Sequence, residues 1–291
     1  MAVKRGLEKG FAGIITGASS GIGKALAIEL ATKYQARLVL NARNEAQLDE
    51  TCKLVEKAGG KAIKALGDVS DESVLDGAVA ACVQTFGNVD LLVNNAGLAK
   101  PGSVMKLTPA DWERVFAVNF FAPLKAIYKV LPHFTSAEKG KIVNISSVAG
   151  KVSFPGSVCY AASKFALTGM SEGMAAEFTS KNIDVITVCP GWVRTEFFEK
   201  NNVASLKNPT FIASKNDLKG LVMRSLLSIS SEECAKEIVK ALEKGGSSEL
   251  VLTHPGKFAE RLAGICPPAM FGLAKLLPEE LVDSSKPEEK N

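Results

Sequence analysis

The stretch Thr16-Gly17-Ala18-Ser19-Ser20-Gly21-Ile22-Gly23 decides the fold of this chain. It follows the apolar run 11–15, which is typical of a buried strand, and it precedes the helical pattern 24–31. Glycines at such a junction let the backbone turn tightly and approach a pyrophosphate closely. The start of the helix then offers free N–H groups and a partial positive charge to the phosphates. Together these features predict a dinucleotide site, with a plain tight turn as the alternative.

Short apolar runs alternate with helical patterns along the chain. We expect strands over residues 11–16, 37–42, 61–66, 89–94, 141–146, 183–189 and 248–252, and helices over about 21–33, 45–58, 71–87, 108–118, 120–137, 157–180 and 231–244. This alternation predicts the α/β class, as a single-domain, Rossmann-like, doubly wound parallel sheet of about seven strands with helices on both faces. Ligands of such sheets bind outside the carboxyl ends of the strands. The glycine-rich turn, Asn94–Gly97, Ser146-Ser147 and Pro190-Gly191 all follow expected strands, so we expect them at one edge.

Tyr160 and Lys164 are spaced i, i+4 within the helical pattern 157–180, so they lie on one face about one turn apart. A phenol normally keeps its proton until about pH 10, and a nearby ammonium favours the phenolate and lowers that pKa. A tyrosine tuned in this way can exchange a proton with a substrate oxygen near neutral pH. The same spacing is common on solvated helix faces. By itself, therefore, the pair does not indicate a catalytic site, and the other motifs have to support this interpretation.

In combination, these motifs resemble those of the short-chain dehydrogenase/reductase family. The resemblance covers roughly residues 8 to 255 and keeps the order and spacing of the TGxxxGxG, NNAG, serine, YxxxK and PG segments. The matching residues are Gly17, Gly21, Gly23, Asn94, Asn95, Ala96, Gly97, Asn119, Ser147, Tyr160, Lys164, Pro190, Gly191 and Thr195.

The resemblance implies an enzyme that moves a hydride between C4 of a nicotinamide and a carbonyl carbon. Tyr160 would donate a proton to the carbonyl oxygen, and Ser147 would hydrogen-bond the same oxygen. Lys164 would lower the pKa of Tyr160 and bind the nicotinamide ribose, and Asn119 would help hold a water that links Lys164 to solvent. Ser146 is the alternative to Ser147, and Asn119 could instead be a polar residue that interrupts a helix.

The cofactor is expected to be NADPH or NADP+ in preference to NAD. Ala42 stands where NAD-dependent members of this fold place an acidic residue, and Arg43 offers a charged donor to a 2′-phosphate. Asp68 matches the family position near the adenine, with a helix N-cap as the alternative role, and Asn95 could be largely structural. The expected cofactor-binding residues are Gly17, Ser19, Ser20, Gly21, Ile22, Gly23, Arg43, Asn44, Asp68, Val69, Asn95, Ala96, Gly97, Tyr160, Lys164, Pro190, Gly191, Val193 and Thr195.

The substrate is expected to be a small hydrophobic carbonyl compound: a ketone, an aldehyde or a 3-oxoacyl group. Residues 192–230 lack clear periodicity, which is typical of a functional lid. Phe154, Trp192, Phe197 and Phe198 suggest an apolar pocket, although ordinary packing is an equal alternative. A hydroxysteroid or alcohol dehydrogenase that works oxidatively would share every motif. A non-catalytic dinucleotide sensor is the rival from another class.

The composition argues against several other classes of protein function. Hydrophobic residues make up 46 % of the 291 residues and charged residues 23 %, and the net charge of +4 without a dense basic run indicates no nucleic-acid partner. The six cysteines are scattered, which favours reduced thiols in a cytoplasmic protein, and Cys159 is not expected to be catalytic. Two histidines outside any ligand cluster make a metal site improbable. No apolar run has the length of a membrane span, and the first residues do not form a signal peptide.

The domain of residues 1–255 is followed by an apolar C-terminal extension, 256–282, and a polar tail, 283–291, that we expect to be disordered. The extension could pack on its own domain, cover the substrate pocket or make peripheral contact with a membrane. The family resemblance implies a homodimer or homotetramer that associates through the helices 120–137 and 157–180.

Overall fold

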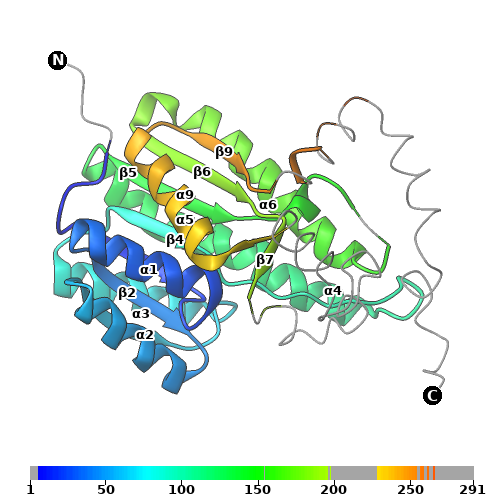
Figure 1. The fold of residues 1–291 in the computed structure, drawn as a ribbon, viewed down its shortest axis with the longest axis horizontal. Coiled ribbons are helices and arrows are strands. Elements are labelled where there is room, and N and C mark those ends of the chain that lie inside the picture. The colour runs from blue at the N-terminus through cyan, green and yellow to red at the C-terminus, as the bar shows by residue number, and fades with distance from the viewer. Residues whose placement is uncertain are drawn as a thin grey trace, which may run out of the picture.

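A seven-stranded parallel sheet lies at the centre of the protein, in the order β3-β2-β1-β4-β5-β6-β9 (Figure 1). The structure is a computed structural model that describes residues 6–153, 155–195, 197, 228–253, 256–258, 261 and 265. The strands are β1 Ala12–Thr16, β2 Arg37–Ala42, β3 Lys61–Leu66, β4 Leu91–Asn94, β5 Gly140–Ile145, β6 Ile183–Cys189 and β9 Ser248–Val251. The strand order reverses between β1 and β4, so the predicted doubly wound α/β fold is confirmed.

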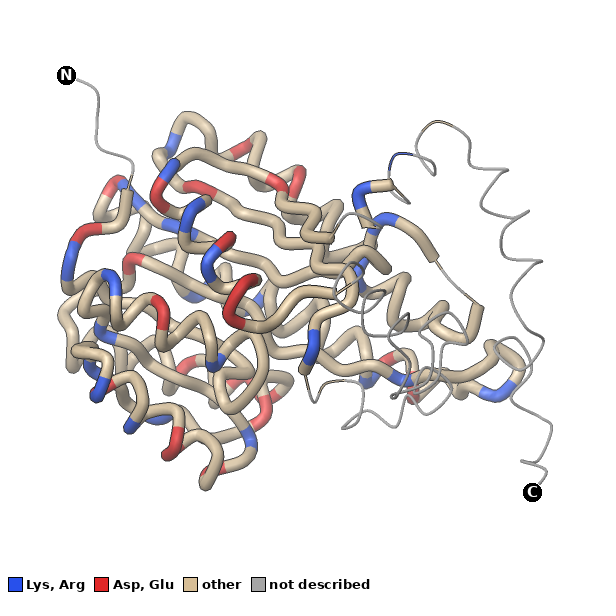
Figure 2. Tube along the Cα trace, in the orientation of Figure 1, with Lys and Arg blue, Asp and Glu red and all other residues tan. Residues whose placement is uncertain are grey.

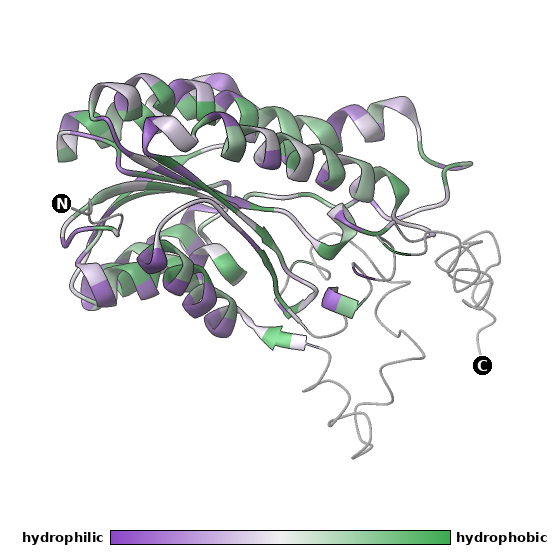
Figure 3. Ribbon diagram, turned by 90° about the horizontal axis from the view of Figure 1, so that it is seen from above, coloured by the Kyte–Doolittle hydropathy of each residue, from purple (hydrophilic) through white to green (hydrophobic). Residues whose placement is uncertain are grey.

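Helices cover both faces of the sheet, as Figure 3 shows from above. They are α1 Gly21–Tyr34, α2 Glu45–Lys57, α3 Glu72–Phe86, α4 Pro109–Phe116, α5 Ala122–Ser136, α6 Val158–Glu177 and α9 Ser231–Lys244. Helices α1, α2 and α9 enclose one core, and α3, α5 and the end of α6 enclose the other. Successive strand residues enter opposite cores because side chains alternate along a strand: Ile15 lies in the first core and Ile14 in the second.

One continuous helical stretch, Pro109–Ser136, joins α4, the π-helical segment η1 Ala117–Phe121 and α5, where the sequence predicts two helices. By length and composition this stretch could cross a membrane, contrary to the expectation that no apolar run is long enough. In the fold it packs on the sheet and on α3, where Lys129 pairs with Glu72 and Asp76 at 3.0 and 2.5 Å. Its role as a core helix therefore explains its apolar composition.

A second, two-stranded parallel sheet was not predicted from the sequence. It pairs β7 Trp192–Arg194 with β8 Ser228–Ser230, the two ends of the expected substrate segment. Nη1 of Arg194 donates to Oγ of Ser228 at 3.0 Å. Strands of three residues are too short to produce a recognisable alternation, which is why the pattern missed them.

Charged residues are distributed along the chain trace, with the two signs interspersed (Figure 2). Some of them join neighbouring helices on one layer: Lys24 of α1 pairs with Glu50 of α2, and Lys33 of α1 with Glu243 of α9, both at 2.7 Å. Within the described residues, these ion pairs therefore connect neighbouring helices of one layer.

Candidate active site

Tyr160 and Lys164 lie on α6, beside the carboxyl end of β5. The side chain of Lys164 is buried, with 3 % of the residue exposed, and its Nζ donates to the carbonyl oxygen of Ile145 at 2.8 Å. The same Nζ lies 5.8 Å from the centroid of the Tyr160 ring. The fold therefore brings the phenol and the ammonium together, as the i, i+4 spacing predicts.

The pKa values of this pair differ from the expectation. Burial raises the pKa of Tyr160 to about 12, against the smaller lowering effect of a hydrogen bond with Ser147. Burial also lowers the pKa of Lys164 to about 8. The net pKa shift of Tyr160 is therefore upward, opposite to the predicted direction, and a lowering by Lys164 during the reaction stays a prediction. The physical reason is that loss of hydration disfavours both charged forms, and the Lys164 ammonium is held by Ile145.

Ser147 and Ser146 have different surroundings. Ser147 precedes the short 3₁₀ turn η2 Val148–Gly150, where its Oγ accepts from the N–H of Ala149 at 3.1 Å, and its side chain also bonds Tyr160. Ser146 is buried; its Oγ lies 2.7 Å from Oγ1 of Thr168 and donates to the carbonyl oxygen of Lys164 at 3.2 Å. Ser147 is therefore the serine that faces the phenol, while Ser146 holds the backbone of α6.

Asn119 lies in η1 and is completely buried. Its Oδ1 accepts from the N–H of Leu98 at 2.8 Å, and its Nδ2 donates to the carbonyl oxygen of Leu98 at 2.8 Å and to Oγ of Ser163 at 2.9 Å. The side chain thus joins the loop after β4, the π-helical segment and α6. A π-bulge within a helix is frequent at functional sites. The expected water at Asn119 stays a prediction.

The glycine-rich turn is held against the loop after β4. Gly17 has φ +65°, and a Cβ there would lie 2.8 Å from the Cα of Ala96, so a side chain cannot fit. Nδ2 of Asn95 donates to the carbonyl oxygens of Thr16 and Gly17, both at 2.9 Å. The same amide would lie 2.5 Å from a Cβ at Gly23. Asn95 therefore connects β1 to β4, and its position leaves no room for a side chain in place of Gly17 or Gly23.

The residues present fit a nicotinamide dinucleotide along this edge. Within the described helix α1, no acidic residue lies in the first turn, which suits an anion at the helix start. A Cβ on Gly21 would lie 3.2 Å from Cγ2 of Thr195. A Cβ on Gly97 would lie 3.6 Å from Phe197 and 3.8 Å from Nζ of Lys164. Glycine thus leaves space at the turn, and again between the ring of Phe197 and Lys164.

The remaining expected residues occupy the same edge. Ser19, Ser20 and Ile22 are partly exposed in the turn and at the start of α1, and Val193 is buried in β7. The carbonyl oxygen of Pro190 accepts from Val148 N–H at 2.9 Å, and Gly191 makes a close approach to Thr253. The structure also shows which residues cap the helices that follow β2 and β3. Oδ1 of Asn44 caps α2 by accepting from the N–H of Gln47, and the N-cap of α3 is Asp71, so Asp68 does not have that alternative role. Val69 lies in the second core.

The aromatic residues expected to line a substrate pocket are only partly described. The Phe197 ring centroid lies 6.1 Å from that of Tyr160, so this side chain adjoins the phenol. Trp192 lies in β7, while Phe154 and Phe198 lie outside the described residues, as do 198–227 and most of 256–291. Cys159 is completely buried, and burial raises the pKa of its thiol to about 11, which does not suit a nucleophile.

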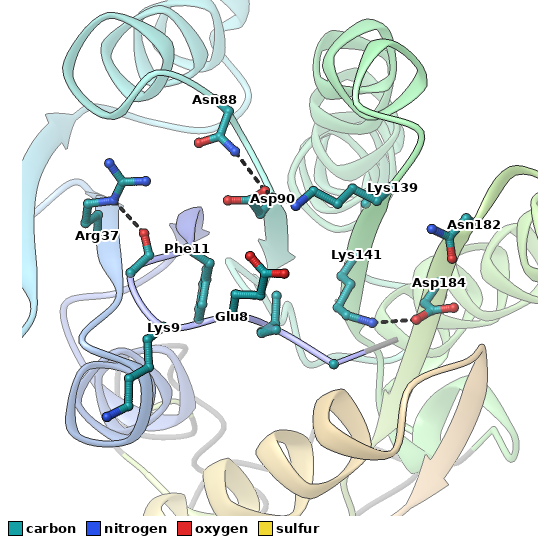
Figure 4. Close-up of a pocket in the computed structure, with 14 residues that line it drawn as sticks. Glu8, Lys9, Phe11, Arg37, Asn88, Asp90, Lys139, Lys141, Asn182 and Asp184 are labelled. Atoms are coloured by element: carbon teal, nitrogen blue, oxygen red, sulfur yellow. Dashed lines mark hydrogen bonds and ion pairs between the residues drawn. The ribbon is translucent and has the colours of Figure 1, made fainter. Parts of the chain in front are cut away.

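A hollow of about 330 Å³ lies at the opposite, amino-terminal edge of the sheet (Figure 4). Two of its ionic side chains pair with groups of the protein itself: Lys141 with Asp184 at 2.5 Å, and Arg37 with the carbonyl oxygen of Gly10 at 2.6 Å. The motif residues do not line it. We therefore assign the chemistry to the carboxyl edge, where the glycine-rich turn and Tyr160 lie.

Arg114 is a residue of this edge that sequence reasoning missed. It lies on α4, and its Nη2 donates to Oδ2 of Asp68 at 2.5 Å. The partners are 46 positions apart in the chain, so no local pattern could signal the contact. Within the described residues, no group of three or more His, Cys, Asp or Glu could hold a metal ion.

Residues 12–205 match the family described as short chain dehydrogenase. The chain belongs to this family. It is 33 % identical over 251 residues to the CLA biosynthesis dehydrogenase/reductase of Lactiplantibacillus plantarum, covering 83 % of this chain and 87 % of that protein. It is 35 % identical over 187 residues to a 3-oxoacyl-(acyl-carrier-protein) reductase of Thermotoga maritima, covering 64 % and 76 %. The crystal structure of levodione reductase shares the fold, with a TM-score of 0.75 and 24 % identity, over 87 % of this chain and all of that one.

Membership in this family establishes the general class of activity of the protein. The protein is an oxidoreductase, and the family uses nicotinamide dinucleotides. Members typically act on small molecules and form oligomers.

Proposed function

We propose that this short-chain dehydrogenase reduces a small hydrophobic carbonyl compound with NADPH, using Tyr160 as general acid. The observation that carries the proposal is the position of Tyr160, whose ring lies 5.8 Å from Nζ of Lys164 and whose hydroxyl bonds Ser147. With a pKa of about 12, Tyr160 keeps its proton at neutral pH, which is the state that a proton donor requires.

The site residues would divide the reaction as follows. When bound, NADPH supplies a hydride to the carbonyl carbon. Ser147 orients the carbonyl oxygen through a hydrogen bond, and Tyr160 gives its proton to that oxygen as negative charge develops, so that an alcohol forms. The phenolate left behind is stabilised by the Lys164 ammonium and regains its proton from solvent. Asn119 would support this return by positioning a water, and its hydrogen bonds to Leu98 keep the surrounding backbone in place.

The substrate class follows from the site and from the relatives. Phe197 offers an apolar wall beside Tyr160. The Thermotoga relative is a 3-oxoacyl reductase, so 3-oxoacyl thioesters join simple ketones and aldehydes as candidates. The oxidative direction, as in an alcohol or hydroxysteroid dehydrogenase, uses the same residues and would start from the phenolate. The ratio of reduced to oxidised cofactor, and not the residues of the site, would decide between the two directions.

The decisive experiment follows NADPH absorbance with a panel of ketones, aldehydes and 3-oxoacyl thioesters. Turnover of at least one carbonyl compound, lost in Tyr160→Phe, supports the proposal. Turnover only of alcohols with NADP+ would support the oxidative alternative. Cofactor binding without turnover in either direction would support a dinucleotide sensor.

We further propose a homodimer or homotetramer that associates through α5 and α6, in the cytoplasm. Phe121, Tyr128 and Phe165 are 49, 65 and 43 % exposed on η1, α5 and α6. Gly169 and Gly173 follow Phe165 at i+4 and i+8, and a Cβ at either glycine would meet open space. Small residues beside exposed aromatic rings allow a second helix to approach closely. Peripheral membrane contact through the extension 256–282 is an alternative use of that segment. The structure describes only residues 256–258, 261 and 265 of it.

A further inference from the structure

We propose that Arg114 is a positioning residue for cofactor choice: it neutralises Asp68 and so leaves Arg43 available for the 2′-phosphate of NADPH. This inference rests on the NADPH preference proposed above. It adds a residue from α4, an element that the cofactor motifs do not include.

Three charged side chains from three elements meet at this corner of the sheet. Arg43 follows β2, Asp68 follows β3, and Arg114 projects from α4. Nη2 of Arg114 donates to Oδ2 of Asp68 at 2.5 Å, and its Nη1 donates to Oγ of Ser70 at 2.6 Å. Ser70 donates to the other carboxylate oxygen, Oδ1, from its N–H at 2.9 Å and from its hydroxyl at 2.7 Å. Asp68 is therefore held from both sides.

Arg43 has a looser relation to the same carboxylate. Its Nη1 lies 3.7 Å from Oδ2 of Asp68, beyond hydrogen-bond distance, and its side chain is 71 % exposed. The closer arginine thus occupies the carboxylate, and the more exposed one can turn toward a ligand. Planar guanidinium groups suit phosphate because they can donate two parallel hydrogen bonds.

The charge balance explains why Arg114 matters. Burial raises the pKa of Asp68, but hydrogen bonds from Arg114 and Ser70 outweigh it and lower the pKa to about 2, so the carboxylate is ionised at neutral pH. With both arginines, the three groups carry a net charge of +1. Without Arg114 the net charge is zero, Arg43 becomes the nearest cation to Asp68, and the carboxylate repels a phosphate beside it. NADH lacks the 2′-phosphate and would be affected less by this change.

A purely structural role is the alternative, because Arg114 also ties α4 to the loop after β3. Loss of a structural tie would weaken both cofactors alike, and removal of the Asp68 charge would not repair it. Loss of charge compensation would weaken NADPH selectively, and removal of that charge would restore the balance.

The test measures the affinities of NADPH and NADH by fluorescence titration, and kcat/KM for both cofactors, and takes the NADPH/NADH ratio of each quantity. The proteins compared are wild type, Arg114→Gln, the double variant Arg114→Gln/Asp68→Asn, and Lys129→Gln. Lys129→Gln is the matched control, since Lys129 likewise ties two elements together, α5 to α3, through Glu72 and Asp76. We expect the NADPH/NADH ratio to fall about tenfold in Arg114→Gln, to return to within about threefold of wild type in the double variant, and to stay unchanged in the control.

The outcomes separate this inference from the proposed function. A wild type that prefers NADH would overturn the proposed NADPH preference, and the inference with it. A wild type that prefers NADPH, together with an unchanged ratio in Arg114→Gln, would overturn the inference alone. A ratio that falls but does not recover in the double variant would overturn compensation of the Asp68 charge as the role of Arg114.

Discussion

At the scale of single residues, burial shifts the pKa values of the active site. The carboxyl edge shields Tyr160 and Lys164 from water, so the pKa of the phenol rises to about 12 and the pKa of the ammonium falls to about 8. Near pH 7 both groups still carry their protons, and these are the states that carbonyl reduction uses. Two predictions follow from these states.

Replacing Tyr160 by Phe removes the proton donor while keeping the ring that packs beside Phe197. We expect kcat to fall about 10²–10⁴-fold, because general acid catalysis is worth that much, and NADPH affinity to change little. Steady-state kinetics and fluorescence titration with NADPH measure the two effects. A variant that keeps more than about a tenth of wild-type kcat would contradict the role of Tyr160.

The pKa of Lys164 sets the pH above which we expect the reaction to slow. Its pKa of about 8 means that it is charged below pH 8 and loses its charge as the pH rises through that value, while Tyr160 stays protonated to about pH 12. We therefore expect kcat/KM for NADPH, which reports the free enzyme, to fall above about pH 8. A profile between pH 6 and 10 measures this. In Lys164→Arg, which stays charged, the inflection near pH 8 should disappear, and an inflection that persists would exclude Lys164 as its origin.

At the scale of elements, a buried ion pair joins β5 to β6. Nζ of Lys141 lies 2.5 Å from Oδ2 of Asp184, the side chains are 8 and 10 % exposed, and Gly246 donates to the same oxygen at 3.0 Å. Breaking one partner of such a pair leaves an uncompensated charge, whereas removing both often costs little.

We expect Lys141→Met to lower the free energy of unfolding by about 3 kcal/mol. The double variant Lys141→Met/Asp184→Leu should recover most of this loss. Urea unfolding followed by circular dichroism measures both. If the double variant were as unstable as the sum of its single variants, the pair would have no coupling energy.

At the scale of the whole molecule, the proposed oligomer requires small residues on the face of α6 that carries Gly169 and Gly173. Gly173→Leu should be tolerated within the subunit, where a Cβ meets open space, and should block the approach of a second copy. We expect light scattering at micromolar concentration to show a shift from oligomer to monomer. The matched control is Gly77→Leu on α3, where a Cβ also meets open space. A wild type that is already monomeric would contradict the oligomer, and dissociation by both variants would contradict the chosen face.

Local pattern by itself determined most of this fold and the position of its site. The strand, glycine-rich turn and helix of 11–34, and the alternation that follows, predict the seven strands that the structure shows. The motifs share one edge because carboxyl ends of parallel strands always do. Periodicity could not detect β7 and β8, which are too short, or the π-helical junction at Asn119, since η1 continues the apolar helical pattern on either side.

Only the tertiary structure decided how the site residues are paired and charged. It separated Ser147 from Ser146, moved the N-cap from Asp68 to Asp71, and placed Arg114 against Asp68. It also raised the pKa of Tyr160, where the sequence spacing predicts a lower value. The physical reason is common to all of these: hydration and long-range hydrogen bonds depend on which distant segments surround a side chain. Neighbours in the chain determine its secondary structure, and neighbours in space determine its chemistry.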